Sequence, residues 1–317
     1  MAGKRHNKMQ TVSPEQMSEI IGVPPAALEL MPAVFPFPFL GYRILRGRKR
    51  DRVVRNVLDL IAEGKLRPAG ANDPANWMRG WGCIRDIVRD EGVSLETLSP
   101  QYHKPLPACR LGGDYVESDD PLFEFKLSVT VRKALLGHFL KDHGKIVEFG
   151  CGTGLNLFIL AQLFPDKELV GCDWVAPSLE MLGEIAASLD RPIGGCTFNM
   201  LDLAGGDDVP LAPDTAVVTA LAMEQLGKDY LPFLGFLLDK KPALCLHIEP
   251  LVELYDADDA ADAAAIRYHR HRNYLEGYVP ALRALAGEGT IEIISERRVK
   301  FGNMFHDQYS TLAWRPL

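Results

Sequence analysis

Residues Lys145–Leu155 read KIVEFGCGTGL, a short apolar run that contains the carboxylate Glu148 and continues into glycine at every second position. The run has the length of a buried strand, and a helix is expected directly after it, near 155–164. A glycine turn between strand and helix lets backbone N–H groups approach a ligand at the carboxyl end of the strand. The stretch therefore predicts a nucleotide-binding α/β unit.

Strand-like and helix-like segments alternate from residue 120 to the end of the chain. A long helix is expected within 121–143, ahead of KIVEF. The further strands expected are KELVGCD, GCTFNML, TAVVTAL, ALCLHIE, TIEIISERRV and DQYSTLAW, with helices near 155–164, 176–189, 229–239 and 260–286. This alternation predicts a doubly wound, mostly parallel seven-stranded sheet. Only FGNMFH separates the last two strands, which should form an antiparallel hairpin at the edge.

The first 119 residues have a different pattern. The spacing of apolar residues predicts helices over 50–66 and 74–98, and Ser13 before Pro14 is typical of a helix start. The proline-rich run MPAVFPFPFL should be extended, and no strand signal precedes about residue 112. We expect a mainly helical N-terminal region, 1–119, that serves as a lid, a substrate region or an oligomerisation region, followed by a sheet domain, 120–317.

Composition limits the class of protein. The 317 residues are 47% hydrophobic, enough for a full core, and their formal net charge of -7 argues against a general nucleic-acid binder. One segment departs from this balance, since RILRGRKRDRVVR (43–55) holds seven basic residues and one acidic residue. The six cysteines form no CxxC pair, which favours free thiols over disulfides or zinc. Without a signal-peptide core or a membrane-length apolar run, we expect a cytoplasmic protein.

The glycine spacing disfavours a dinucleotide. The dinucleotide fingerprint G-x-G-x-x-G would need glycine at position 155, where this chain has leucine. Glu148 would also repel a pyrophosphate, whereas it would attract a ligand with an ammonium or sulfonium group.

The segment EFGCGTG, Glu148–Gly154, resembles the first motif of class I S-adenosylmethionine-dependent methyltransferases, E/D-x-G-x-G-x-G. The order of elements over 120–317, with its terminal antiparallel hairpin, is similar to the seven-stranded Rossmann-like sheet of that family. The resemblance implies S-adenosyl-L-methionine as the cofactor and methyl transfer as the reaction.

The resemblance also implies which residues hold the cofactor. The backbone of the turn, through Gly150, Cys151, Gly152 and Gly154, would pass close to the methionine moiety and ribose. Glu148 would help to hold the amino-acid part of the cofactor.

Further cofactor contacts are implied at the ends of the next two strands. Asp173, 19 positions beyond Gly154, would accept both ribose hydroxyls, and Trp174 would pack against adenine. Leu201 would flank the ring, while Asp202 would accept from the adenine amino group. Simple packing for Trp174 and a turn role for Asp202 stay open. Tyr115 lies in a segment that closes over the cofactor in related enzymes.

Candidate catalytic groups follow the fourth and fifth strands, because methyl transfer needs an aligned nucleophile and, where it carries a proton, a base. Glu224 follows TAVVTAL, and His247 and Glu249 share one face of LCLHIE. Each of them is a candidate base or orienting group, although strand-end side chains of this kind also cap neighbouring elements. No compact metal-ligand pattern is present.

The acceptor is left open by the sequence. We favour a hydroxyl or amine of a small molecule, because no aromatic-rich RNA module accompanies the basic segment 43–55. An RNA or protein methyltransferase that uses this segment, or a non-catalytic cofactor-binding relative, is the alternative. A homodimer is possible, and the reason to consider it is only that homodimers are common among soluble proteins.

Overall fold

The computed structural model describes residues 8–29, 40–66, 68–69, 73–100 and 106–317, and a seven-stranded sheet dominates it. Its strands are β5 (Lys145–Phe149), β6 (Glu168–Asp173), β7 (Gly194–Thr197), β8 (Ala216–Ala220), β9 (Leu244–Glu249), β10 (Ile291–Arg297) and β12 (Ser310–Pro316). They pair in the order β10-β12-β9-β8-β5-β6-β7, and only the pairings of β12 are antiparallel. The predicted doubly wound sheet with an antiparallel edge is confirmed.

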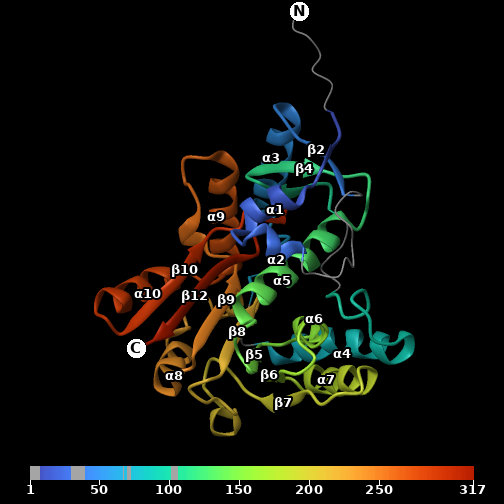
Figure 1. The fold of residues 1–317 in the computed structure, drawn as a ribbon. Coiled ribbons are helices and arrows are strands. Elements are labelled where there is room, and N and C mark those ends of the chain that lie inside the picture. Colours follow the sequence, from blue (N-terminus) through green and yellow to red (C-terminus); the bar gives the residue numbers. More distant parts are fainter. Residues whose placement is uncertain (1–7, 30–39, 67, 70–72, 101–105) are drawn as a thin grey trace, which may run out of the picture.

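Helices bury both faces of this sheet (Figure 1). Those of the C-terminal two thirds are α5 (Phe123–Leu140), α6 (Leu155–Leu163), α7 (Ala176–Ser188), α8 (Leu231–Lys240), α9 (Ala260–Arg272) and α10 (Tyr278–Gly287), with short 3-10 turns η2 (Gly206–Asp208), η3 (Met223–Leu226) and η4 (Val252–Leu254). Consecutive residues Ile146 and Val147 of β5 belong to different apolar clusters. The first cluster includes α5, α6 and α7, and the second includes α8 and α10. A strand buried on both faces has the continuous apolar sequence found in KIVEF.

The prediction of one helix over 260–286 is wrong, because two helices occupy this range. Asn273 ends α9 in the left-handed conformation, with φ of 52°, a position at which asparagine is tolerated. The linker then pairs with η3, since the backbone N–H of Leu275 donates to the carbonyl of Glu224 at 3.0 Å. The break therefore attaches the α9–α10 segment to the loop that follows β8.

The N-terminal region is mainly helical, but it also contains short strands. Its elements are β1 (Gln10–Thr11), α1 (Pro14–Ile21), α2 (Pro25–Glu29), β2 (Gly41–Ile44), α3 (Arg48–Ala62), α4 (Pro74–Glu91), β3 (Cys109–Leu111) and β4 (Asp114–Glu117). The predicted helix start is confirmed, because the Ser13 side chain caps α1. Most of the run MPAVFPFPFL lies outside the described residues.

The prediction that no strand precedes residue 112 is wrong. A second sheet has the order β1-β2-β4-β3-β11, in which β11 (Phe301–Asn303) comes from the C-terminal part of the chain. Strands of two to four residues are too short for a periodic signal. The sequence did contain a turn signal, since Gly112 and Gly113, both at positive φ, join β3 to β4. The boundary expected at residue 119 stays a prediction.

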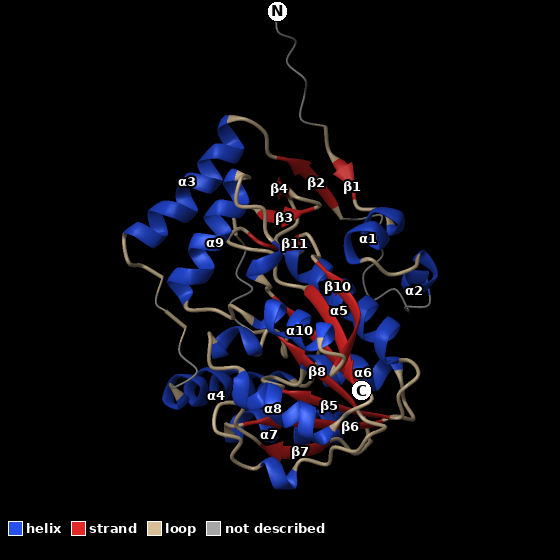
Figure 2. Ribbon diagram, turned by 90° about the vertical axis from the view of Figure 1, so that its left-hand side faces the viewer, coloured by secondary structure: helices blue, strands red, loops and turns tan. Residues whose placement is uncertain are grey.

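Helix α4 lies apart from the second sheet and packs beside α7 (Figures 1 and 2). Arg85 and Arg89 of α4 form ion pairs with Glu180 and Glu184 of α7 at 2.8–3.1 Å. These pairs fix α4 close to the carboxyl ends of β5 and β6. None of the helices in the described ranges is long and apolar enough to cross a bilayer.

Three buried charges and one half-buried charge join the two sheets. Arg110 of β3 donates to Asp307 at 2.7 Å and also to Asp262 of α9. Arg298 completes the cluster, because it donates to Asp307 at 2.8 Å and to Asp262 at 2.7 Å. Two guanidinium groups and two carboxylates therefore balance in a site where an unpaired charge would be costly.

Arg110→Met should lower the free energy of unfolding by about 3–5 kcal/mol, because it leaves buried carboxylates without one of their two cationic partners. Arg43→Met is the matched control, since Arg43 pairs with Asp119 at the surface and such a pair is worth about 1 kcal/mol or less. Urea denaturation followed by circular dichroism measures both. Equal losses for the two variants would contradict a structural role for the buried cluster.

Candidate active site

The glycine turn forms a floor of bare backbone at the carboxyl end of β5. Gly150 and Gly152 have φ of 67° and 53°, which side-chain-bearing residues rarely adopt. A Cβ on Gly150 would lie 2.5 Å from the Cβ of Ala222, and one on Gly152 would lie 3.2 Å from the ring of Trp81. Both positions therefore need glycine for conformation and for space.

The third glycine of the motif has a different role. A Cβ on Gly154 would lie 2.6 Å from Ile185, so Gly154 allows α6 to pack against α7. Neither Gly154 nor Cys151 is among the residues that line the cavity described next. The cofactor contacts expected of these two residues have no support in their position.

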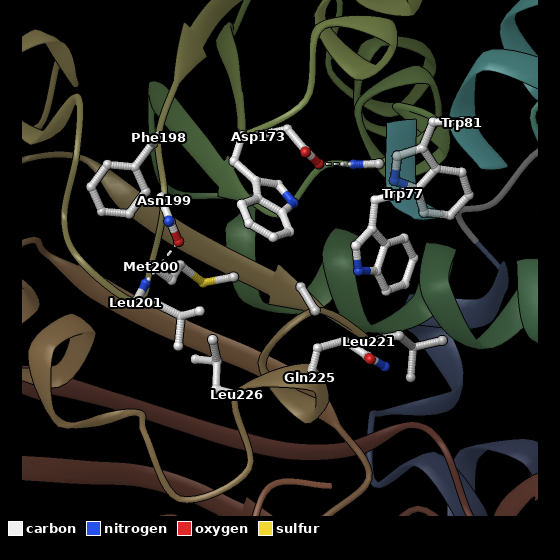
Figure 3. Close-up of a pocket in the computed structure, with 14 residues that line it drawn as sticks. Trp77, Trp81, Asp173, Phe198, Asn199, Met200, Leu201, Leu221, Gln225 and Leu226 are labelled. Atoms are coloured by element: carbon white, nitrogen blue, oxygen red, sulfur yellow. Dashed lines mark hydrogen bonds between the residues drawn. The ribbon is translucent and has the colours of Figure 1, made fainter. Parts of the chain in front are cut away.

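A cavity lies above the turn, with about 600 Å³ of free space including its mouth. It is lined by Trp77, Trp81, Gly150, Gly152, Asp173, Trp174, Phe198, Asn199, Met200, Leu201, Leu221, Ala222, Gln225 and Leu226. Figure 3 shows two ends, one around Phe198 and Met200 and the other around Trp77 and Gln225. The walls are mostly apolar with a few polar groups, as in small-molecule sites.

Asp173 lies at the edge of this cavity and also holds the turn in place. Its Oδ2 accepts from the backbone N–H of Gly152 at 2.9 Å, and its Oδ1 accepts from Val175 at 3.2 Å (Figure 3). Burial raises the pKa of its carboxyl, although these bonds oppose the shift. The predicted cofactor residues Trp174 and Leu201 line the cavity beside it.

Two other predicted cofactor residues lie elsewhere. Asp202 is exposed, and its Oδ1 accepts from the backbone N–H of Ala204 at 3.0 Å in a tight turn. Tyr115 is buried in β4, where its hydroxyl donates to the carbonyl of Met304 at 3.1 Å. Neither residue is among those that line the cavity. The turn role that the sequence left open for Asp202 matches its position.

A buried polar chain lies beneath the turn. Asn156 donates to Oε1 of Glu148 at 2.6 Å and accepts from Arg132 at 2.9 Å. Oε2 of Glu148 and Nε of Arg132 are buried and have no hydrogen-bond partner among the described residues. Burial raises the pKa of Glu148 to about 8. Unpaired buried polar atoms of this kind are expected to have partners, such as water or the polar groups of a ligand.

Glu249 organises the loop after β8. Its Oε1 accepts from the backbone N–H groups of Ala222 and Met223, both at 3.1 Å, and its Oε2 accepts from Glu224 at 3.3 Å. The same loop holds Leu221 at φ of 56°, a strained conformation for leucine. Burial raises the pKa of Glu249 to about 7. Glu249 thus fixes the backbone at the cavity edge rather than facing the cavity.

His247 is enclosed by hydrogen-bond partners. Its Nδ1 lies 2.9 Å from the Thr219 hydroxyl, and its Nε2 lies 2.9 Å from the Tyr278 hydroxyl. The ring is fully buried, and burial lowers its pKa to about 3. With both nitrogens engaged and no place in the cavity lining, His247 is positioned as part of the core.

Glu224 is the predicted catalytic residue nearest to the cavity lining. It is partly buried, and its Oε1 accepts from the side-chain amide of Gln225 at 2.8 Å. Gln225 itself lines the cavity. Burial, together with the charge of Glu249, raises the pKa of Glu224 to about 8. Its carboxyl can therefore exchange a proton near neutral pH.

Sequence reasoning missed the tryptophans of α4. Trp77 and Trp81 are one helical turn apart, so both side chains face the cavity, with ring centroids 5.4 Å apart. The signal was present in WMRGW, because the four-residue spacing of the tryptophans places both on one face of a helix. What the sequence could not reveal is that α4 packs on α7, far along the chain.

No protein-family model and no curated protein matches the sequence. Among solved structures, similarity is found to a SAM dependent methyltransferase from Aquifex aeolicus, with a TM-score of 0.43, 14% identity and coverage of 63% of this chain and 95% of that one. It is also found to the N,N-8-amino-8-demethyl-D-riboflavin dimethyltransferase RosA from Streptomyces davawensis, with a TM-score of 0.40, 14% identity and coverage of 62% and 57%. A third is the O-methyltransferase NcsB1 from neocarzinostatin biosynthesis, with a TM-score of 0.40, 14% identity and coverage of 62% and 59%.

Likeness at this level concerns the fold and carries no argument about activity. The strand order of the chain itself, β10-β12-β9-β8-β5-β6-β7 with antiparallel β12, gives the firmer basis. By that order, the domain has the seven-stranded Rossmann-like fold of class I S-adenosylmethionine-dependent methyltransferases.

Proposed function

We propose that the protein is an S-adenosylmethionine-dependent methyltransferase that acts on a hydroxyl or amine of a small molecule. The observation that carries the proposal is the conjunction of a bare glycine floor, an acidic residue at the end of β6 and a buried carboxylate with an unpaired oxygen beneath the turn. Each of these features suits a different part of one cofactor.

The residues present fit S-adenosyl-L-methionine. Asp173 lies at the cavity edge at the end of β6, where its carboxyl would be an acceptor for ribose hydroxyls beside the backbone N–H groups that it already holds. Trp174 and Leu201 offer apolar surfaces for adenine. Glu148 and Arg132 lie beneath the turn and not in the cavity lining, and each has an unpaired buried polar atom. These atoms would suit the ammonium and carboxylate of an amino acid, once Glu148 has lost its proton.

The bound cofactor would supply an electrophilic methyl group on a sulfonium. The protein's part is alignment and removal of water, because methyl transfer is an in-line displacement. Glu249 holds the backbone of Ala222 at the cavity edge. Glu224 does not line the cavity itself but is linked to Gln225, which does, and we propose that it takes the acceptor's proton through water. A group with a pKa of about 8 suits a base near neutral pH.

The ion pairs that the basic segment 43–55 forms within the protein favour a small acceptor over RNA. Arg43, Lys49 and Arg50 in this segment form ion pairs with Asp119, Glu117 and Asp259. Nearly half of its seven basic residues thus balance carboxylates within the protein instead of forming a free cationic track. The tryptophans of α4 also cover the cavity, which suits a small ligand.

The acceptor class can be tested directly. Purified protein is incubated with methyl-labelled S-adenosylmethionine and, separately, with total tRNA, total protein or a metabolite extract. Label should transfer only to the metabolite extract. Transfer to tRNA or protein would overturn the small-molecule proposal, and cofactor binding without any transfer would favour a non-catalytic cofactor-binding protein.

Asp173→Ala should weaken binding of S-adenosylhomocysteine at least about tenfold, because charge-assisted hydrogen bonds to the ribose are lost. Asp202→Ala is the control, since the Asp202 side chain holds a turn at the surface, and its binding should change less than about twofold. Isothermal titration calorimetry measures both, and circular dichroism checks that each variant is folded. Unchanged binding by Asp173→Ala would remove the basis for the cofactor assignment.

Binding of S-adenosylhomocysteine should strengthen as pH rises from 6 to 8. The pKa of Glu148 is about 8 in the free protein, so at pH 6 its carboxyl is protonated and must lose a proton to pair with the ligand's ammonium. The dissociation constant should fall at least about fivefold over this range. Glu148→Gln should bind more weakly and lose most of the pH dependence. Calorimetry in buffers of different ionisation enthalpy counts the released proton, and a slope that persists in Glu148→Gln would assign it to another group.

A further inference from the structure

The end of the cavity around Trp77 and Gln225 differs in composition from the end around Phe198 and Met200. Trp77, Trp81 and Leu221 lie at the former end with Gln225, and Gln225 is the one side chain of these four that can accept a hydrogen bond, since an indole N–H only donates (Figure 3). The single ionisable residue of the cavity lining, Asp173, accepts from Gly152, which Trp81 approaches, and lies apart from Gln225. The part of the cavity around Trp77, Leu221 and Gln225 is therefore lined by uncharged side chains, and it suits neither a phosphate nor an ammonium group.

The two indoles give this end its shape. Both are half-buried, although each could bury more area in a closed core, as the fully buried Trp314 does. Their planes are 34° apart, and Arg85 and Arg89 of the same helix form surface ion pairs with α7. Partly exposed indoles at a cavity mouth provide flat faces for a flat ligand.

Gln225 gives the site a hydrogen-bonding group of defined orientation. Its Nε2 donates to Glu224 at 2.8 Å, so its amide orientation is set from behind. The amide oxygen is then the group left to accept a hydrogen bond from a ligand in the cavity. An O–H or N–H on the ligand would meet this oxygen, which matches a methyl acceptor that carries a proton.

From these observations we infer that the end of the cavity formed by Trp77, Trp81, Leu221 and Gln225 binds a neutral planar aromatic acceptor through one hydroxyl or amino group. The inference rests on the proposed function, since the other end of the cavity is assigned to the cofactor. It goes further in naming the chemical class of the acceptor and the residues that select it.

The test uses the full-length protein saturated with S-adenosylhomocysteine and the probes 2-naphthol and decahydro-2-naphthol. The two probes share a ring skeleton and a hydroxyl, but only the first is planar. Calorimetry should give a dissociation constant about three- to tenfold lower for 2-naphthol, because stacking favours the planar ring. Equal affinity for the two probes, or no detectable binding of 2-naphthol by cofactor-saturated protein, would overturn the inference.

Trp77→Leu keeps an apolar side chain but removes the flat ring. It should abolish the preference for 2-naphthol while the affinity for S-adenosylhomocysteine changes less than about twofold. Met78→Ala is the matched control, because Met78 is exposed on the same helix and does not line the cavity. A preference retained in Trp77→Leu would rule out the indole as its source.

Gln225→Leu separates the hydrogen bond from stacking. Wild-type protein should prefer 2-naphthol to 2-methoxynaphthalene, which cannot donate, and the variant should lose this preference. If wild-type protein does not bind S-adenosylhomocysteine at all, the proposed function fails first. If the protein binds S-adenosylhomocysteine but the probe preferences do not depend on Trp77 or Gln225, the inference about the acceptor is refuted and the proposed function is not.

Discussion

The close approach of the glycine turn to the end of β8 is the constraint on which the site depends. The backbone at Gly150 lies so near Ala222 that no side chain fits between them. Two neighbouring strands therefore end in loops that share one surface, and each loop is held from behind by a buried carboxylate. Asp173 fixes the turn through Gly152, and Glu249 fixes the opposite loop through three consecutive N–H groups. Buried acids here replace the side-chain packing that glycine cannot supply.

These acids also explain the unusual electrostatics of the region. Glu148, Glu224 and Glu249 are each buried enough for the pKa to rise to about 7 or 8. Their mutual repulsion adds to the cost of burial. A cationic ligand relieves this cost, whereas an anionic one increases it. The same reasoning separates this turn from a pyrophosphate site, although the backbone geometry of the two is related.

The sequence predicted the sheet well because its strands are continuous apolar runs between clear turns, as in KIVEF. The turn and Asp173 were predicted because their spacing is local along the chain. The N-terminal sheet was not predicted, because a strand such as β3 has only three residues and pairs with β11, which is distant in the sequence. His247 and Glu249 were expected to face the ligand because they end a strand. In the structure, His247 instead bonds to the hydroxyls of Thr219 and Tyr278, and Glu249 bonds to backbone N–H groups. These partners lie on other segments of the chain, and only the fold brings them close.

The shared second sheet has a consequence for how the chain folds. Strand β3 can find its partner β11 only after residues up to Asn303 have been made, and Arg110 and Asp307 are 197 positions apart. Strand β3 must therefore wait, with one edge unpaired, until β11 has left the ribosome. Contacts of such long range slow folding and expose chains to aggregation in the interval. A sheet whose strands β3 and β4 are made early is thus completed late, so its closure requires the segment that contains β11.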